Sequence, residues 1–179
     1  MNLFILRHAS AGLRRSNPLL DVKRPLDKDG KRYCLQLAQV LNAMKLQFDL
    51  IVSSPLKRSL QTASLVGNET AYESQILLSK ALAPDATLAD FHKLLQECNN
   101  HYENLLVVGH NPNLTLFLSS SLVPASANTM PLIRLRKGSL ARVSFTRGPG
   151  TLTWLLDPRM VRALYATSTK SSRRKTSRK

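Results

Sequence analysis

The chain has 179 residues, a length that fits one domain with a substantial apolar core. It carries 26 lysine and arginine residues against 11 aspartate and glutamate residues, for a formal net charge of +15, which favours anionic ligands such as phosphates. No apolar run approaches the length of a membrane span and the N-terminus lacks the layout of a signal peptide, so we expect a cytoplasmic protein with no membrane partner.

Two short apolar runs in the first third of the chain predict buried strands. NLFIL at 2–6 and DLIVS at 49–53 are rich in Leu and Ile and lack a two-residue alternation, as expected when both faces of a sheet are covered. Between them, apolar residues recur at helical spacing from about 28 to 44, with Asp27 as the cap. A second helix is expected to begin at Ser54-Pro55, since Ser is a favoured N-cap and Pro fits the first helical position.

The remaining elements continue the alternation of strands and helices, and the last two are a pair of adjacent strands. A helix is expected at about 87–98, a strand at 104–108 and a helix that begins at Asn111-Pro112. The alternating segments at 139–145 and 151–156, joined by the turn signal RGPG, predict an antiparallel hairpin at the edge of the sheet. The order of elements predicts an α/β three-layer sandwich, with a central, largely parallel sheet flanked by helices.

The last residues have a different composition from the rest. Six of the positive charges lie in the final ten residues, KSSRRKTSRK, which is typical of a disordered tail. We therefore divide the chain into a domain at 1–165 and a basic tail at 166–179. Such a tail can bind nucleic acid by counterion release, but it has no aromatic residue for base stacking, and a solvated terminus is the favoured interpretation.

Three of the predicted strands end in polar residues that suit a phosphate. The first ends in Arg7-His8, the second leads into SSPLKRSLQTA with Arg58 in the first helical turns, and the third ends in His110-Asn111. Ligands of open α/β sheets bind beyond the carboxyl ends of the strands, and arginine forks match phosphoryl oxygens. We expect these residues to converge on a phosphoryl group, which a neutral imidazole is able to attack near physiological pH.

These motifs resemble those of a known family. LRHASAG is similar to the RHG-type signature of the histidine phosphatase (phosphoglycerate mutase-like) superfamily, with Ala9 where many members have glycine. SSPLKRSLQTA and VVGHNPNL resemble its second and third motifs, in the same order. With RPLDKDG at 24–30 and the small size, the chain looks most like the SixA-type phosphohistidine phosphatases. The resemblance covers most of residues 1–158 and implies a phosphoglycerate mutase-like fold.

The resemblance also implies a role for individual residues. His8 would be the phosphorylated nucleophile, while Arg7, Arg58 and His110 would bind the phosphoryl oxygens. Arg24, in the RPL stretch, would be a further phosphate contact. The backbone N–H of Asn111 would add another donor.

One departure from the family pattern concerns the proton donor. Many members supply a carboxylic acid downstream of the second motif, to protonate an alcohol leaving group. Asp85 is the single acid in the loop expected here, and is the candidate donor. Because imidazole is a far better leaving group than an alkoxide, the lack of an obvious acid at this place favours a phosphorus–nitrogen bond or an activated phosphate over a sugar phosphate.

The sequence therefore predicts a metal-independent phosphatase, without a cofactor, that acts through a phosphohistidine intermediate on the enzyme. No metal ligand set is recognised, and Cys34 and Cys98 lack metal-ligand spacing and are expected to be reduced. The favoured substrate is phosphohistidine on a signalling protein, such as a phosphotransfer domain. Two alternatives stay open: a phosphatase of small phosphoesters or nucleotides, and a protein that binds nucleic acid or an acidic partner through its tail.

Overall fold

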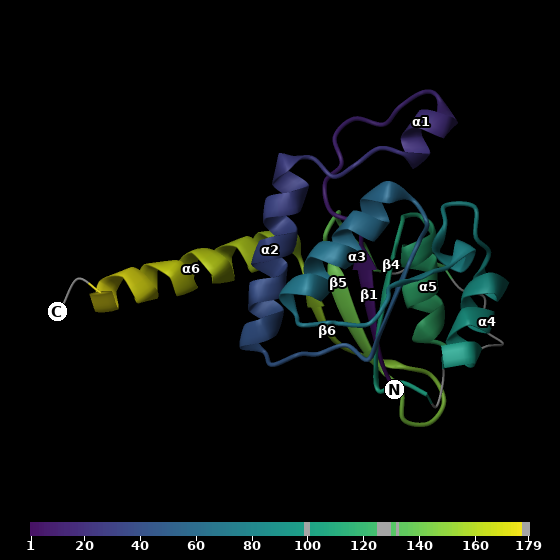
Figure 1. Ribbon diagram of the computed structural model, residues 1–179. Helices are drawn as coiled ribbons and strands as arrows, with labels where there is room; N and C mark the ends of the chain where they lie inside the picture. The colour runs from purple at the N-terminus through teal and green to yellow at the C-terminus, as the bar shows by residue number, and fades with distance from the viewer. Residues whose placement is uncertain (99–100, 125–129, 132, 177–179) are drawn as a thin grey trace.

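The computed structural model describes residues 1–98, 101–124, 130–131 and 133–176, with side chains as far as 167. The elements follow the order strand, helix, strand that the sequence predicts, and Figure 1 shows their arrangement. In chain order they are β1 (Asn2–Arg7), α1 (Pro18–Val22), α2 (Lys28–Ala43), β2 (Leu50–Ser53), α3 (Lys57–Glu69), β3 (Leu77–Leu78), the 3₁₀ turn η1 (Lys80–Leu82), α4 (Leu88–Cys98), β4 (Asn104–Gly109), α5 (Asn113–Ser121), β5 (Leu140–Ser144), β6 (Thr151–Leu156) and α6 (Pro158–Thr176).

Six strands form one mixed sheet in the order β3-β2-β4-β1-β5-β6. The first four are parallel, and β5 and β6 form the predicted antiparallel hairpin at the edge. In the register of the central strands, Arg7 lies beside Gly109, and Ser53 lies beside Val108. The carboxyl ends of β2, β4 and β1 are therefore neighbours, as the sequence analysis requires for a shared site.

Helices cover both faces of this sheet. Phe4 and Leu6 pack with buried residues of α2, α3 and the start of α6, whereas Leu3 and Ile5 pack with those of η1, α4 and α5. Successive side chains of a strand point to opposite faces, so β1 contributes to two separate cores. Burial of each such side chain stabilises the fold by about 1.5–3 kcal/mol. This arrangement confirms the predicted three-layer α/β sandwich.

Two helices begin later than their sequence signals indicate. We expected a helix from Ser54-Pro55, but α3 begins at Lys57 with Leu56 as an N-cap that makes no side-chain hydrogen bond. The Ser54 hydroxyl lies 2.9 Å from Nε2 of His110 and accepts from the N–H of Leu56 at 3.4 Å, so it contacts the site as well as the start of the helix. Similarly, α5 begins at Asn113, two residues beyond the expected start.

The chain is helical where we expected a tail. Helix α6 runs from Pro158 to Thr176, and Figure 1 shows its far end projecting away from the sheet. Val161 is buried against the α2 side of the sheet, and the segment after Pro158 contains no further Gly or Pro to end the helix. Side chains at 168–179 lie outside the described part, so the division at 166 and nucleic-acid binding by the tail stay predictions. Within the described ranges, no helix is long and apolar enough to cross a bilayer.

Candidate active site

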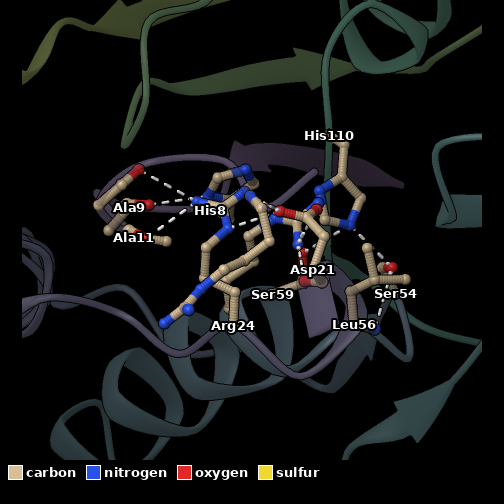
Figure 2. Close-up of polar contacts among 12 residues, drawn as sticks. His8, Ala9, Ala11, Asp21, Arg24, Ser54, Leu56, Ser59 and His110 are labelled. Carbon is tan, nitrogen blue, oxygen red and sulfur yellow. Dashed lines mark hydrogen bonds and ion pairs between the residues drawn. The ribbon is translucent and has the colours of Figure 1, made fainter. Parts of the chain in front are cut away.

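The two predicted histidines follow neighbouring parallel strands and meet at the carboxyl edge of the sheet. The N–H of His8, just after β1, donates to the carbonyl of Gly109 at the end of β4, with a nitrogen–oxygen distance of 3.1 Å. The centroids of the His8 and His110 rings are 5.0 Å apart. Only 6% of His8 and 3% of His110 is exposed. The structure thus brings both rings to the floor of one site (Figure 2).

His8 is held as a neutral imidazole with one defined free nitrogen. Its Nδ1 lies 2.7 Å from the carbonyl oxygen of Ala9, which can only accept, so Nδ1 carries the proton. Nε2 then keeps its lone pair. Burial is the main cause that lowers the pKa of His8 to about 3, and the nearby positive charges of Arg58 and Arg7 lower it further. At neutral pH, Nε2 of His8 is therefore unprotonated, and its lone pair is available.

His110 is oriented by two serine hydroxyls. Its Nε2 lies 2.9 Å from Oγ of Ser54 and 3.2 Å from Oγ of Ser59, while its buried Nδ1 has no hydrogen-bond partner. When both hydroxyls donate to Nε2, the proton of the neutral ring lies on Nδ1. Burial, followed by the charges of the neighbouring site residues, lowers the pKa of His110 to about 2. The neutral ring thus presents an Nδ1–H donor to a ligand.

Arg7 and Arg58 are each anchored by a hydrogen bond to a backbone carbonyl, and each keeps a buried donor without a partner. Nη1 of Arg7 donates to the carbonyl of Leu135 at 2.9 Å. Arg58, in the first turn of α3, donates from Nη1 to the carbonyl of Asp21 at 2.9 Å. The buried Nε atoms of both arginines lack a partner, as Nδ1 of His110 does. Three buried donors on residues that line one cavity would be satisfied by an anion.

Asp21 is the main site residue that the sequence analysis missed. Its carboxylate lies 2.8 Å from Nε of Arg24 and 3.2 Å from Nη1 of Arg58. Burial alone raises the pKa of Asp21, but hydrogen bonds from Arg24 and from the backbone of Arg15, with the charge of Arg58, lower it to about 2. The sequence offers one sign of its role, its position three residues before Arg24, which suits an ion pair. The same spacing also occurs in ordinary ion pairs on a solvated surface, so it does not identify a site residue.

The other predicted site residues also line the cavity, with different surroundings. Arg24 donates to Asp21 and to the carbonyl of Ala11, so it fixes the loop after β1, and its contact with substrate stays a prediction. The side chain of Asn111 donates to a backbone carbonyl at 3.0 Å. Asp85 is exposed at the cavity, and its role as an acid stays a prediction.

The cavity has a volume of about 970 Å³ and a strongly basic lining. Six basic side chains, including Lys137, line it against the two acids Asp21 and Asp85. Over the part of the chain that the structure describes, no three His, Cys, Asp or Glu residues are grouped as metal ligands. The basic lining suits a phosphoryl group, because arginine side chains match and neutralise its negatively charged oxygens.

Comparisons with known proteins agree with this geometry. The family model described as histidine phosphatase superfamily (branch 1) matches residues 3–83, which contain Arg7, His8 and Arg58. The phosphohistidine phosphatase SixA of Escherichia coli K12 is 28% identical over 160 residues, which cover 88% of this chain and 94% of that protein. An uncharacterized protein of Picosynechococcus is 34% identical over 116 residues, 64% of this chain and 68% of that protein.

Solved structures show the same fold. The structure of protein histidine phosphatase SixA complexed with tungstate has a TM-score of 0.76 and 25% identity, and the match covers 89% of this chain and 98% of that one. A putative SixA from Agrobacterium tumefaciens has a TM-score of 0.72 and 20% identity, with 88% and 97% covered. The predicted phosphoglycerate mutase-like fold is confirmed.

Proposed function

Because the chain belongs to the histidine phosphatase superfamily, we propose that it hydrolyses phosphohistidine carried by another protein. The observation that carries the proposal is the state of His8: a buried, neutral ring whose Nε2 is free and whose neighbours are two arginines with unsatisfied donors. A nucleophile in this setting forms a covalent bond to phosphorus and divides the hydrolysis into two easier steps.

In the first step, Nε2 of His8 attacks phosphorus and the bond between phosphorus and the substrate nitrogen breaks. The electron pair of that bond leaves with the substrate imidazole, which departs neutral when its other ring nitrogen is protonated. In the second step, water attacks phospho-His8, the new phosphorus–nitrogen bond breaks, and inorganic phosphate and free His8 result. Arg7, Arg58 and the Nδ1–H of His110 stabilise the phosphoryl oxygens throughout.

The ionised state of Asp21 favours a phosphorus–nitrogen bond over an ester as the substrate. Asp21 is paired with two arginines and has a pKa of about 2, so it has no proton to give at neutral pH. Asp85 lies exposed at the cavity. Hydrolysis of an alkyl phosphate gains about 10²–10⁴-fold from a general acid, whereas a protonated phosphohistidine needs little such help.

The likeness to SixA supports a protein as the carrier of the phosphohistidine. The proposed partner is a phosphotransfer domain of a cytoplasmic signalling relay, from which the enzyme would remove phosphate. The presence of Asp85 at the cavity favours a second candidate, a phosphatase of small phosphoesters in which Asp85 protonates the leaving alcohol.

A comparison of substrates tests the proposal. A phosphohistidine protein and a panel of small phosphoesters are hydrolysed separately in EDTA, by wild type, His8→Ala and the control His101→Ala, which replaces an exposed histidine outside the cavity lining. We expect fast release from the phosphohistidine protein, lost in His8→Ala and retained in the control. Release from small esters alone, abolished by Asp85→Asn, would establish the second candidate instead.

A further inference from the structure

The segment between β1 and α2, residues 12–23 and hereafter the α1 segment, exposes an unusual number of apolar side chains. The exposed fractions are 91% for Leu13, 77% for Leu19, 52% for Leu20 and 46% for Val22. No residue of helix α1 is buried. Single exposed apolar residues are ordinary, but four within ten residues, each close to half exposed or more, are typical of a surface that meets a partner.

This segment also forms a wall of the catalytic cavity. Seven of the cavity's lining residues belong to it: Gly12, Arg14, Arg15, Ser16, Pro18, Asp21 and Val22. Figure 1 shows α1 standing beyond the carboxyl end of β1, apart from the other helices. The ion pairs of Asp21 hold the segment at the site. Of the four exposed apolar side chains, Val22 lines the cavity, and the other three lie on the same short segment outside the lining. Leu77 and Leu78 of β3 are comparably exposed, but no residue of β3 lines the cavity.

The depth of the nucleophile makes contact at this wall unavoidable for a protein substrate. His8 is only 6% exposed, at the floor of the cavity. A phosphohistidine side chain that reaches it brings its own backbone, and the surface around it, to the rim. On one side, that rim presents the exposed leucines together with Arg14, Arg15 and Lys23. This combination matches an acidic surface with apolar residues.

We propose that the α1 segment is the docking surface for the protein that carries the phosphohistidine, with Leu19 and Leu20 as its apolar contacts and Lys23 as a charged one. The proposal rests on the proposed function and adds the place and chemistry of the contact. The partner surface it requires is acidic, with apolar side chains beside the phosphorylated residue. Free phosphohistidine or phosphoramidate would enter the same cavity without this contact.

A pair of double variants separates docking from chemistry. Leu19→Ser/Leu20→Ser alters the α1 segment at two residues that do not line the cavity, and Leu77→Ser/Leu78→Ser removes two leucines of comparable exposure from β3 as a matched control. Each is assayed for kcat/KM on a phosphorylated, acidic histidine phosphotransfer domain and on phosphoramidate. A third variant, Lys23→Glu, tests whether the positive charge of Lys23 contributes to binding of the phosphoprotein.

We expect the α1 double variant to lower kcat/KM on the phosphoprotein at least tenfold, through KM, with phosphoramidate hydrolysis unchanged. Lys23→Glu should lower kcat/KM on the phosphoprotein by a smaller factor, and that factor should decrease at high salt. The β3 control should leave kcat/KM on both substrates unchanged. Equal losses on both substrates, or no loss on the phosphoprotein, would overturn the docking surface alone. A wild type that hydrolyses phosphoramidate but not the phosphoprotein would overturn the proposed function, and the docking surface with it.

Discussion

The two buried histidines predict a loss of stability between pH 7 and pH 5. Both are neutral in the folded protein, with pKa values of about 3 for His8 and about 2 for His110, against 6.5 as the ordinary value. Because the folded pKa is the lower one, protons bind preferentially to the unfolded chain, and stability falls as pH falls below 6.5. Each group contributes about 2 kcal/mol of loss by pH 5, so the pair contributes about 4 kcal/mol, a large part of a typical stability.

Urea unfolding at pH 7 and pH 5 measures this difference. His8→Gln and His110→Gln should each reduce the acid-induced loss by about 2 kcal/mol, and the double variant should remove most of it. Aspartates, whose unfolded pKa lies near 3.8, take up few protons in this window, so they do not obscure the effect. A wild type as stable at pH 5 as at pH 7 would refute the neutral, buried state of the two rings.

Three substitutions test the supports of the site. Asp21→Asn leaves two arginines without their anionic partner, so unfolding should require about 3 kcal/mol less, and added inorganic phosphate should restore more stability in the variant than in wild type. Ser59→Ala removes one of the two hydroxyls at Nε2 of His110, which should lower kcat about fivefold and move the ¹⁵N chemical shifts of the His110 ring towards those of a tautomer mixture. Unchanged ¹⁵N shifts would contradict the orienting role of Ser59. Gly138→Ala should lower the free energy of unfolding by about 3 kcal/mol, because its φ is +85° and a Cβ atom would lie 2.3 Å from Tyr33; a stable, active variant would contradict this close approach.

The convergence of the site was predictable because it depends on topology. Arg7-His8 and His110 each follow a buried strand, and parallel neighbouring strands must end at the same edge of the sheet. Arg58 was predictable from its place at the start of the helix after the next strand. Local pattern and global fold agree at these positions, so four residues from three separate parts of the sequence could be assigned to one place.

Other features depend on side-chain geometry that no pattern encodes. Ser54 looked like an N-cap, yet its hydroxyl contacts His110 and α3 begins at Lys57. Ser59 contacts the same ring from inside the helix, where a serine usually carries no signal. Asp21 could not be told from a solvated charge, because its second partner, Arg58, lies 37 residues away. For α6, a basic composition indicated disorder, whereas the helix continues through these residues and no Gly or Pro interrupts it.

His8 is the proposed acceptor of the phosphoryl group, and trapping the phosphorylated enzyme tests this role directly. Wild type, His8→Asn and the control His101→Asn are mixed with a ³²P-labelled phosphohistidine protein in EDTA, quenched within milliseconds in alkali, digested and mapped. We expect label that is stable to base and labile to acid, on the peptide that contains His8, in wild type and the control but not in His8→Asn. Turnover with no label on the enzyme, or label on another residue, would contradict it.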